Sequence, residues 1–272
     1  MVAIVVVSRR MGGIVSEPAA ILAAAMASVL RERLEPDVEV LRLDRPAQRN
    51  ALDSASVDEL LSILASLAGE DGPRVVVVST TSERALCAGA DVNEPLDRDG
   101  GIARMEAFTR LYAAIEAFPA VTVCVCVGNV VGAGAELAAG CDLRVGGENL
   151  KLAWAGARLG VPVGPARLAP LIGLSRARDL VFTGRVVGAV EAFELGFLNR
   201  VAGGLAEAEA EALSLAGQIA GNDGVGVRRL KRMFREFEGV GAGERVAREN
   251  EILLAWQREG AGLPAGGRPA GG

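Results

Sequence analysis

The residues whose types and spacing could best support catalysis form one short stretch, Gly132 to Glu136. This stretch follows an apolar, β-branched run at 121–127. This order predicts a strand, a tight turn and the start of a helix. Glycines let other groups approach the backbone closely, and the first N–H groups of a helix lack partners within it. Glu136 lies about one turn inside this helix. The N–H groups at the helix start could therefore bind an anionic oxygen while Glu136 acts on the same ligand as an acid or base. The pattern fits equally well a closely packed turn with an ordinary polar residue at its edge.

The chain contains no histidine, and this narrows the possible chemistry. Ser-His-Asp and Cys-His nucleophile systems and the commonest catalytic zinc sites need an imidazole, so they are largely excluded. Acid/base work then falls to carboxylates, lysine, tyrosine or cysteine. The four cysteines form no CxxC pair: Cys87, Cys124, Cys126 and Cys141. We interpret them as buried structural thiols in a reducing cytoplasm and predict no metal site.

Composition limits the possible partners. The chain has 272 residues with a net charge of −5 and only 4% aromatic residues, so it lacks the basic field and stacking rings of nucleic-acid-binding proteins. The Ala-rich segment at 18–30 is shorter than the roughly 20 residues that span a membrane. Two arginines follow the first apolar run rather than precede it, which is wrong for a signal peptide. We therefore expect neither a nucleic-acid nor a membrane partner, and a cytoplasmic location.

We interpret the first 35 residues as a peripheral leader with an amphipathic helix. After them, strand and helix patterns alternate. Residues 38–43 alternate as a strand, 54–67 have helical spacing, 74–79 are a continuous apolar strand, and 104–118 are helical again. This alternation predicts an α/β fold with parallel strands. The Gly/Pro/Ala tail at 259–272 is typical of disorder.

A second loop with small residues follows the apolar strand: Cys87-Ala88-Gly89-Ala90-Asp91. Small residues around Gly89 allow the backbone to expose its N–H groups, and α/β sheets usually place ligands where strands end. A tight crossing of two loops would need the same residues.

Four segments, taken in order, resemble a known family. Residues 44–52 (DRPAQRNAL) resemble an RPxxxNAL motif, 87–91 a CAGAD loop, 132–137 a GGGxEL turn, and 180–201 an LTGxxxxAxEAxxxGLVNxV segment. These motifs are typical of the crotonase superfamily, the enoyl-CoA hydratases and isomerases, and the similarity runs from about residue 38 to 256.

The resemblance implies a spiral core of ββα turns at 36–202, rather than a doubly wound sheet, and a C-terminal helical region at 203–258 that forms homotrimers or hexamers. It implies a lyase or isomerase acting on an acyl-CoA thioester, with coenzyme A as part of the substrate and no separate cofactor. The N–H groups of Ala90 and Ala133 would hold the thioester oxygen, after the turn at Gly132. Four further residues of the first loop would lie near the adenine: Ala88, Gly89, Asp91 and Val92.

Such a site needs no histidine, because two fixed N–H donors stabilise the negative charge that develops on the thioester oxygen. Composition and resemblance therefore agree.

The chain departs from the family pattern at the second catalytic carboxylate. Hydratases of the family carry another glutamate 20 residues after the first, and here that position is Gly156, in a register supported by Leu159 and Gly160. The loop at 160–168 is also about three residues shorter than in the family. Standard hydratase and isomerase activities are both doubtful without this acid.

Three interpretations remain open. Glu136 acts alone in an unusual acyl-CoA reaction such as isomerisation, hydrolysis or decarboxylation. Another acid, Glu94, Glu106 or Glu116, refills the site. Alternatively, the chain is a non-catalytic acyl-CoA-binding or assembly subunit.

Three neighbouring features are also ambiguous. Trp154 either lines the acyl pocket beside Gly156 or belongs to the core. Asp142 is expected to orient backbone, and the basic segment at 228–235 either meets CoA phosphates or is a solvated face.

Overall fold

The computed structural model describes residues 27–34, 37–69 and 72–239, together with residues 241, 244, 251 and 252. The predicted tail at 259–272 and most of the predicted leader lie outside these residues.

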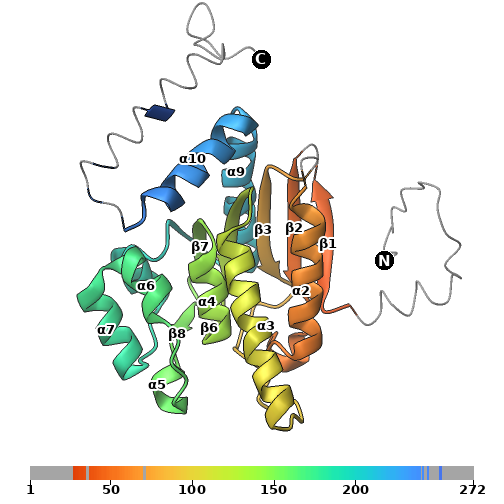
Figure 1. The fold of residues 1–272 in the computed structure, drawn as a ribbon, viewed down its shortest axis with the longest axis vertical. Coiled ribbons are helices and arrows are strands. Elements are labelled where there is room, and N and C mark those ends of the chain that lie inside the picture. The colour runs from red at the N-terminus through yellow and green to blue at the C-terminus, as the bar shows by residue number, and fades with distance from the viewer. Residues whose placement is uncertain are drawn as a thin grey trace, which may run out of the picture.

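A six-stranded sheet forms the centre of the fold (Figure 1), in the order β1-β2-β3-β5-β7-β9. Its strands are β1 (Val29–Leu34), β2 (Val38–Leu43), β3 (Val75–Thr80), β5 (Val121–Cys126), β7 (Leu143–Gly147) and β9 (Arg200–Ala202). β1 is antiparallel to β2, and every other pairing is parallel. All six residues of β3 are buried, as expected for a continuous valine run in a strand covered on both faces.

Two helical layers cover this sheet. On one face, α2 (Ser54–Leu67) and α3 (Arg98–Glu116) lie side by side (Figure 1), and their apolar residues share a core with Val76 and Val78. On the other face, α9 (Leu205–Ala220) packs its alanines against Val75 and Val77. Alternate residues of β3 therefore supply two separate cores, as the strand period of two requires.

A second, three-stranded sheet carries the candidate site. It consists of β4 (Ala85–Cys87), β6 (Asn129–Val131) and β8 (Lys151–Ala153), all parallel. Parallel strands end at one edge, so the segments that follow them meet there. These segments are the loop at 88–91, the start of α4 (Ala133–Gly140) and the turn into α5 (Gly156–Leu159).

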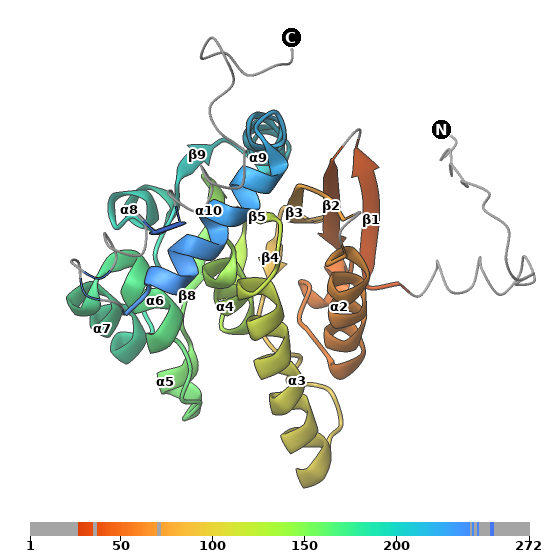
Figure 2. The ribbon, with the colours of Figure 1, turned by 45° about the horizontal axis from the view of Figure 1, so that its top comes forward.

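The remaining helices complete the C-terminal half. They are α6 (Pro165–Ile172), α7 (Leu174–Thr183), α8 (Ala189–Glu194) and α10 (Gly224–Phe237), and η1 (Pro46–Gln48) is a single 3-10 turn near the start. Figure 2 shows α10 crossing in front of α4 and α6. No helix among the described residues is long and apolar enough to cross a membrane.

The predicted α/β class, the strand at 38–43 and the helix at 54–67 are confirmed. The two largest differences from the predicted boundaries are at β1 and at the start of α3. The sheet begins with β1 at Val29, inside the predicted leader. The sequence did not predict this strand, because it is an edge strand that exposes its charged central residues and shows no alternation of apolar and polar residues. α3 begins at Arg98, six residues before the prediction, where the Asp97 side chain accepts a hydrogen bond from Gly100 N and caps the helix.

Candidate active site

The Ala90 amide lies in a loop whose direction is set by a bridge to Leu52. Leu52 N donates to Gly89 O, and Asp91 N donates to Leu52 O, each at 2.8 Å. The Gly89 carbonyl therefore points toward Leu52. In a trans peptide the N–H is opposed to the carbonyl, so the Ala90 N–H points away from Leu52.

The Ala133 amide has a matching arrangement at the start of α4. Gly132 adopts φ 53°, a left-handed value that favours glycine, and its carbonyl accepts from Glu136 N at 2.9 Å. Ala133 is the first helical residue, so its N–H has no acceptor within the helix. Backbone hydrogen bonds also occur outside the regular pairing of helices and strands. Among the described residues, neither Ala133 N nor Ala90 N is the donor of such a bond.

The two loops touch through their backbones. A Cβ on Gly134 would lie 2.3 Å from Cys87 O, and a Cβ on Gly89 would lie 3.3 Å from Val131 O. Only glycine permits the approach at position 134, and Gly89 in addition has φ 115°, a value that side chains rarely adopt. Two peptide units with open N–H groups thus lie on adjoining loops at one sheet edge.

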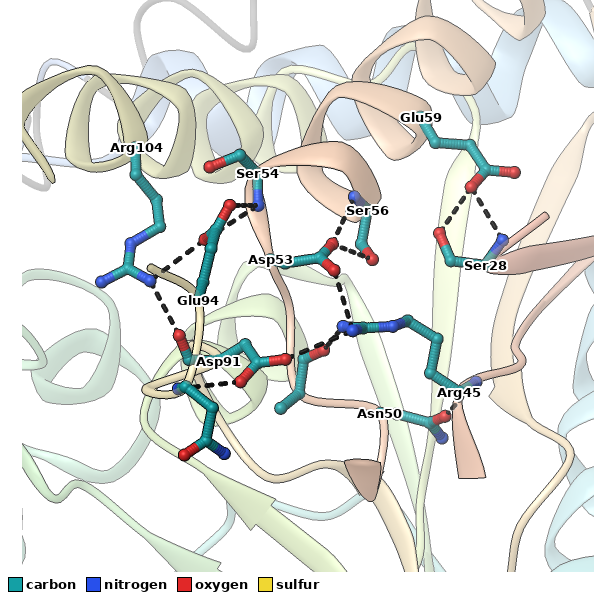
Figure 3. A network of polar contacts seen from close by, with 12 residues as sticks. Ser28, Arg45, Asn50, Asp53, Ser54, Ser56, Glu59, Asp91, Glu94 and Arg104 are labelled. Atoms are coloured by element: carbon teal, nitrogen blue, oxygen red, sulfur yellow. Dashed lines mark hydrogen bonds and ion pairs between the residues drawn. The ribbon is translucent and has the colours of Figure 1, made fainter. Parts of the chain in front are cut away.

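Ion pairs and helix caps hold the first loop in place (Figure 3). Arg45 Nη2 lies 3.2 Å from Asp91 Oδ2 and 2.8 Å from an oxygen of Asp53, the N-cap residue of α2. Arg104 Nη1 donates to Asp91 O at 2.8 Å and to Glu94 Oε2 at 3.2 Å. Burial raises the pKa of Asp53, but hydrogen bonds from Ser56 and the charge of Arg45 outweigh it, so that the pKa is lowered overall.

This network bears on two residues that the sequence assigned to the substrate loop. The Asp91 side chain is buried and bonded to Arg45 and to Asn93 N, so it anchors the loop. Val92 is 79% exposed.

Glu136 is not isolated. Its side chain is buried, Trp154 Nε1 donates to its Oε1 at 2.7 Å, and Arg167 Nη1 donates to its Oε2 at 3.0 Å. Arg167 Nε also lies 2.7 Å from Glu116 Oε1, and the guanidinium carbon lies 4.9 Å from the centre of the Tyr112 ring. The carboxylate is thus part of a network that joins α3, α4 and α6.

Trp154 belongs to the core. It is 1% exposed and makes an edge-to-face contact with Phe197 at 5.6 Å between ring centres. The sequence left two roles open for Trp154, and the structure places it in the core, where it also donates a hydrogen bond to Glu136.

Gly156 has no room for a side chain. A Cβ there would lie 2.5 Å from Val161 O, because the shortened loop folds back and Val161 N donates to Gly156 O at 2.9 Å. The path of the chain at Val161 therefore leaves no space for a carboxylate at position 156.

The three glutamates proposed as replacements have different surroundings. Glu94 accepts from Ser54 N and Arg104, and Glu106 is exposed on α3. Glu116 reaches Glu136 through Arg167, but its own carboxylate is bound by that arginine.

Sequence reasoning missed Arg167 and Tyr112. Arg167 is 31 residues from Glu136, near the end of the loop at 160–168, and no role was assigned to it from the sequence. Tyr112 is the single tyrosine of a chain without histidine, a signal that could have found it. Burial first, and then the charges of Glu136 and Cys87, raise the pKa of the Tyr112 phenol, so it stays protonated.

The remaining predictions concern the thiols and α10. All four cysteines are buried and free, and burial raises the pKa of Cys87 to about 12. From the sequence, Asp142 is expected to orient the backbone after α4; it does bind backbone, but its partner is Thr122 N of β5, at 2.7 Å. Within the basic segment, Lys231 is buried against Asp142 at 2.6 Å, whereas Arg232 and Arg235 are exposed.

Comparison with known proteins identifies the family. A family model described as "Enoyl-CoA hydratase/isomerase" matches residues 33–251. The chain belongs to this family. Its mixed α/β fold with two sheets and C-terminal helices is that of crotonase structures.

Individual relatives agree with this assignment. The chain is 31% identical to the 2,3-dehydroadipyl-CoA hydratase of Escherichia coli, over 79% of this chain and 85% of that protein. It is 33% identical to the enoyl-CoA isomerase/hydratase claC of Penicillium crustosum over 65% of this chain, but spans only 21% of that longer protein. The crystal structure of an enoyl-CoA hydratase from Bacillus anthracis superposes with a TM-score of 0.80 at 28% identity, covering 84% and 90% of the two chains.

Proposed function

We propose that this member of the enoyl-CoA hydratase/isomerase family binds an acyl-CoA thioester and stabilises its enolate, with Glu136 as the acid/base group. The observation that carries the proposal is the pair of open amides, Ala90 N–H and Ala133 N–H, on adjoining loops. A thioester deprotonated at its α-carbon places negative charge on oxygen. A preorganised donor of this kind is worth about 10²–10³-fold in rate.

Ordinary hydration is not expected. Adding water across a double bond needs a group for the water proton and another for the α-carbon, and each contributes about 10²–10⁴-fold. The second position is Gly156, which cannot carry a side chain without displacing Val161 O. The chemistry that fits is a proton transfer served by one carboxylate, as in an isomerisation or decarboxylation.

Glu136 can still serve as that carboxylate. Each carboxylate oxygen has two lone pairs, and the bonds from Trp154 and Arg167 use one on each oxygen.

The direct test is deuterium exchange at the α-carbon of butyryl-CoA in heavy water, because it detects an enolate without knowledge of the natural substrate. We expect the wild-type protein to exchange this proton, and Glu136→Gln to bind the thioester without exchanging it. Glu148→Gln, an exposed glutamate after β7, is the matched control and should behave as wild type. Hydration of crotonyl-CoA, followed in parallel, should be slower by about 10²–10⁴-fold than in a two-glutamate relative. Failure to bind either thioester contradicts the proposal.

A second candidate function is thioester binding without turnover. The observation that favours it is that Glu136 is buried with both oxygens hydrogen-bonded. Tight binding of butyryl-CoA without exchange, with Glu136→Gln indistinguishable from wild type, would establish this role instead.

We also propose that the protein assembles as a homotrimer or hexamer. α10 supports this, because it exposes Leu230 by 55% and Phe234 by 76% among arginines. Light scattering after size-exclusion chromatography should give three or six times the chain mass, and a monomer at micromolar concentration would exclude it.

A further inference from the structure

Arg167 lies between two carboxylates of unequal exposure. Its Nη1 is 3.0 Å from Glu136 Oε2, and its Nε is 2.7 Å from Glu116 Oε1. The Glu136 side chain is 1% exposed, whereas that of Glu116 is 42% exposed. One guanidinium thus joins a buried acid on α4 to a half-exposed acid on α3.

The two donors fix how the Glu136 carboxylate is turned. Trp154 Nε1 contacts one oxygen and Arg167 Nη1 the other, so rotation of the carboxylate would break at least one bond. Bonds from an ionised donor are stronger than neutral ones, so the arginine is the stronger constraint. Among the described residues, Arg167 is the cation within ion-pair distance of this buried acid.

Arg167 is itself held in place from α3. The guanidinium carbon lies 4.9 Å from the Tyr112 ring centre, and Arg167 Nη2 donates a hydrogen bond to Glu116 Oε2 at 3.4 Å. These contacts leave Nη1 directed at Glu136. Arg167 and Glu116 also line a groove beneath α10, so this side of the network faces solvent.

We propose that Arg167 is a positioning residue for Glu136, fixing the direction of the carboxylate lone pairs that remain for a substrate, and that Glu116 holds Arg167 for this task. The catalytic consequence rests on the proposed enolate function. The positioning itself does not, and the experiment separates the two.

The first measurement needs no substrate. The indole N–H of Trp154 donates to Glu136, so its NMR resonance reports the position of the carboxylate. The chain has two tryptophans, so in a Trp256→Phe background Trp154 gives the only indole N–H signal. We expect Glu136→Gln and Arg167→Met to move this signal, Arg167→Lys to move it less, and Glu116→Gln to move it least.

Arg167→Met leaves a buried carboxylate without its cation and can fail to fold for that reason. The double variant Glu136→Gln with Arg167→Met removes both charges, and it should fold and give the Trp154 signal of Glu136→Gln alone. A Trp154 signal that moves in Glu136→Gln but not in folded Arg167→Lys or Arg167→Met would overturn the proposal.

The second measurement concerns catalysis. In the butyryl-CoA exchange reaction, Arg167→Lys should lower kcat about tenfold with KM little changed, because the donor is kept but its planar fork is lost. Arg178→Lys, an exposed arginine on α7, is the matched control and should match wild type. Equal kcat values for Arg167→Lys and wild type would overturn the catalytic part. If the wild-type protein exchanges no proton, the proposed function fails, whereas the Trp154 signal still decides the positioning.

Discussion

The Ala90 and Ala133 amides and the Glu136 carboxylate lie around the same sheet edge but differ in their partners. The amides are directed by bonds to the carbonyls of their own peptide units, and their N–H groups stay open. The carboxylate is bonded on both oxygens by Trp154 and Arg167. We call these the amide half and the carboxylate half of the site.

The two halves depend on different parts of the chain, the backbone in one and side chains in the other. The amide half depends on backbone and on glycines that allow close approach, so the identity of the side chain at Ala133 does not alter the donor. The carboxylate half depends on side chains, and the loop that folds back at Val161 leaves no space for a side chain at Gly156.

Within the amide half, loss of one amide should have the largest effect on activity. Ala133→Pro removes the N–H at the first position of α4, where a helix tolerates proline. We expect thioester exchange to fall by about 10²–10³-fold with the fold retained. Ala133→Gly keeps the donor and should stay near wild type. Exchange rates for the two variants provide the test, and equal rates would mean that this amide is not used.

Contact between the two loops of the amide half should be the next most sensitive feature. Gly134→Ala places a Cβ 2.3 Å from Cys87 O, and such overpacking costs about 1–3 kcal/mol in the free energy of unfolding. Gly101→Ala is the matched change inside α3, where a Cβ meets nothing within 4 Å, and it should stabilise by about 0.5–1 kcal/mol. Urea denaturation measures both, and a stabilising Gly134→Ala would refute the close contact.

Restoring the lost acid should not restore hydration. In Gly156→Glu the new Cβ meets Val161 O at 2.5 Å, so we expect about 1–3 kcal/mol of lost stability and no increase in crotonyl-CoA hydration. A clear gain of hydration in a stably folded variant would show that the loop gives way, and that the carboxylate half lacks only its acid.

The cap that supports the amide half should give the smallest effect. Asp53→Ala removes the α2 cap and the Arg45 pair, and should cost about 1 kcal/mol at neutral pH. Asp53→Asn keeps the cap and should cost less. Because the pKa of Asp53 is lowered below 3.8 in the folded state, its stabilisation is present above that pH and is lost as the pH falls further. Urea titrations at pH 7 and pH 3 should therefore show a smaller difference between variant and wild type at the lower pH.

Local patterns made much of this structure predictable. β2 and α2 follow from alternation and helical spacing, and both amide loops follow from small residues after strands. β1 was missed because an edge strand with exposed charges has no apolar face to reveal it. The carboxylate network was missed for a different reason. Trp154 and Arg167 are 18 and 31 residues from Glu136, and only the tertiary packing of α6 and of the segment after β8 against α4 brings them together.

The carbonyl stretch of bound butyryl-CoA tests the central claim most directly, because two amide bonds to the thioester oxygen weaken the C=O bond. Isotope-difference infrared spectroscopy of the complex should show the stretch at lower frequency than in free butyryl-CoA. The lowering should persist in Glu136→Gln and shrink in Ala133→Pro. A bound thioester whose carbonyl stretch equals that of the free ligand would contradict the account.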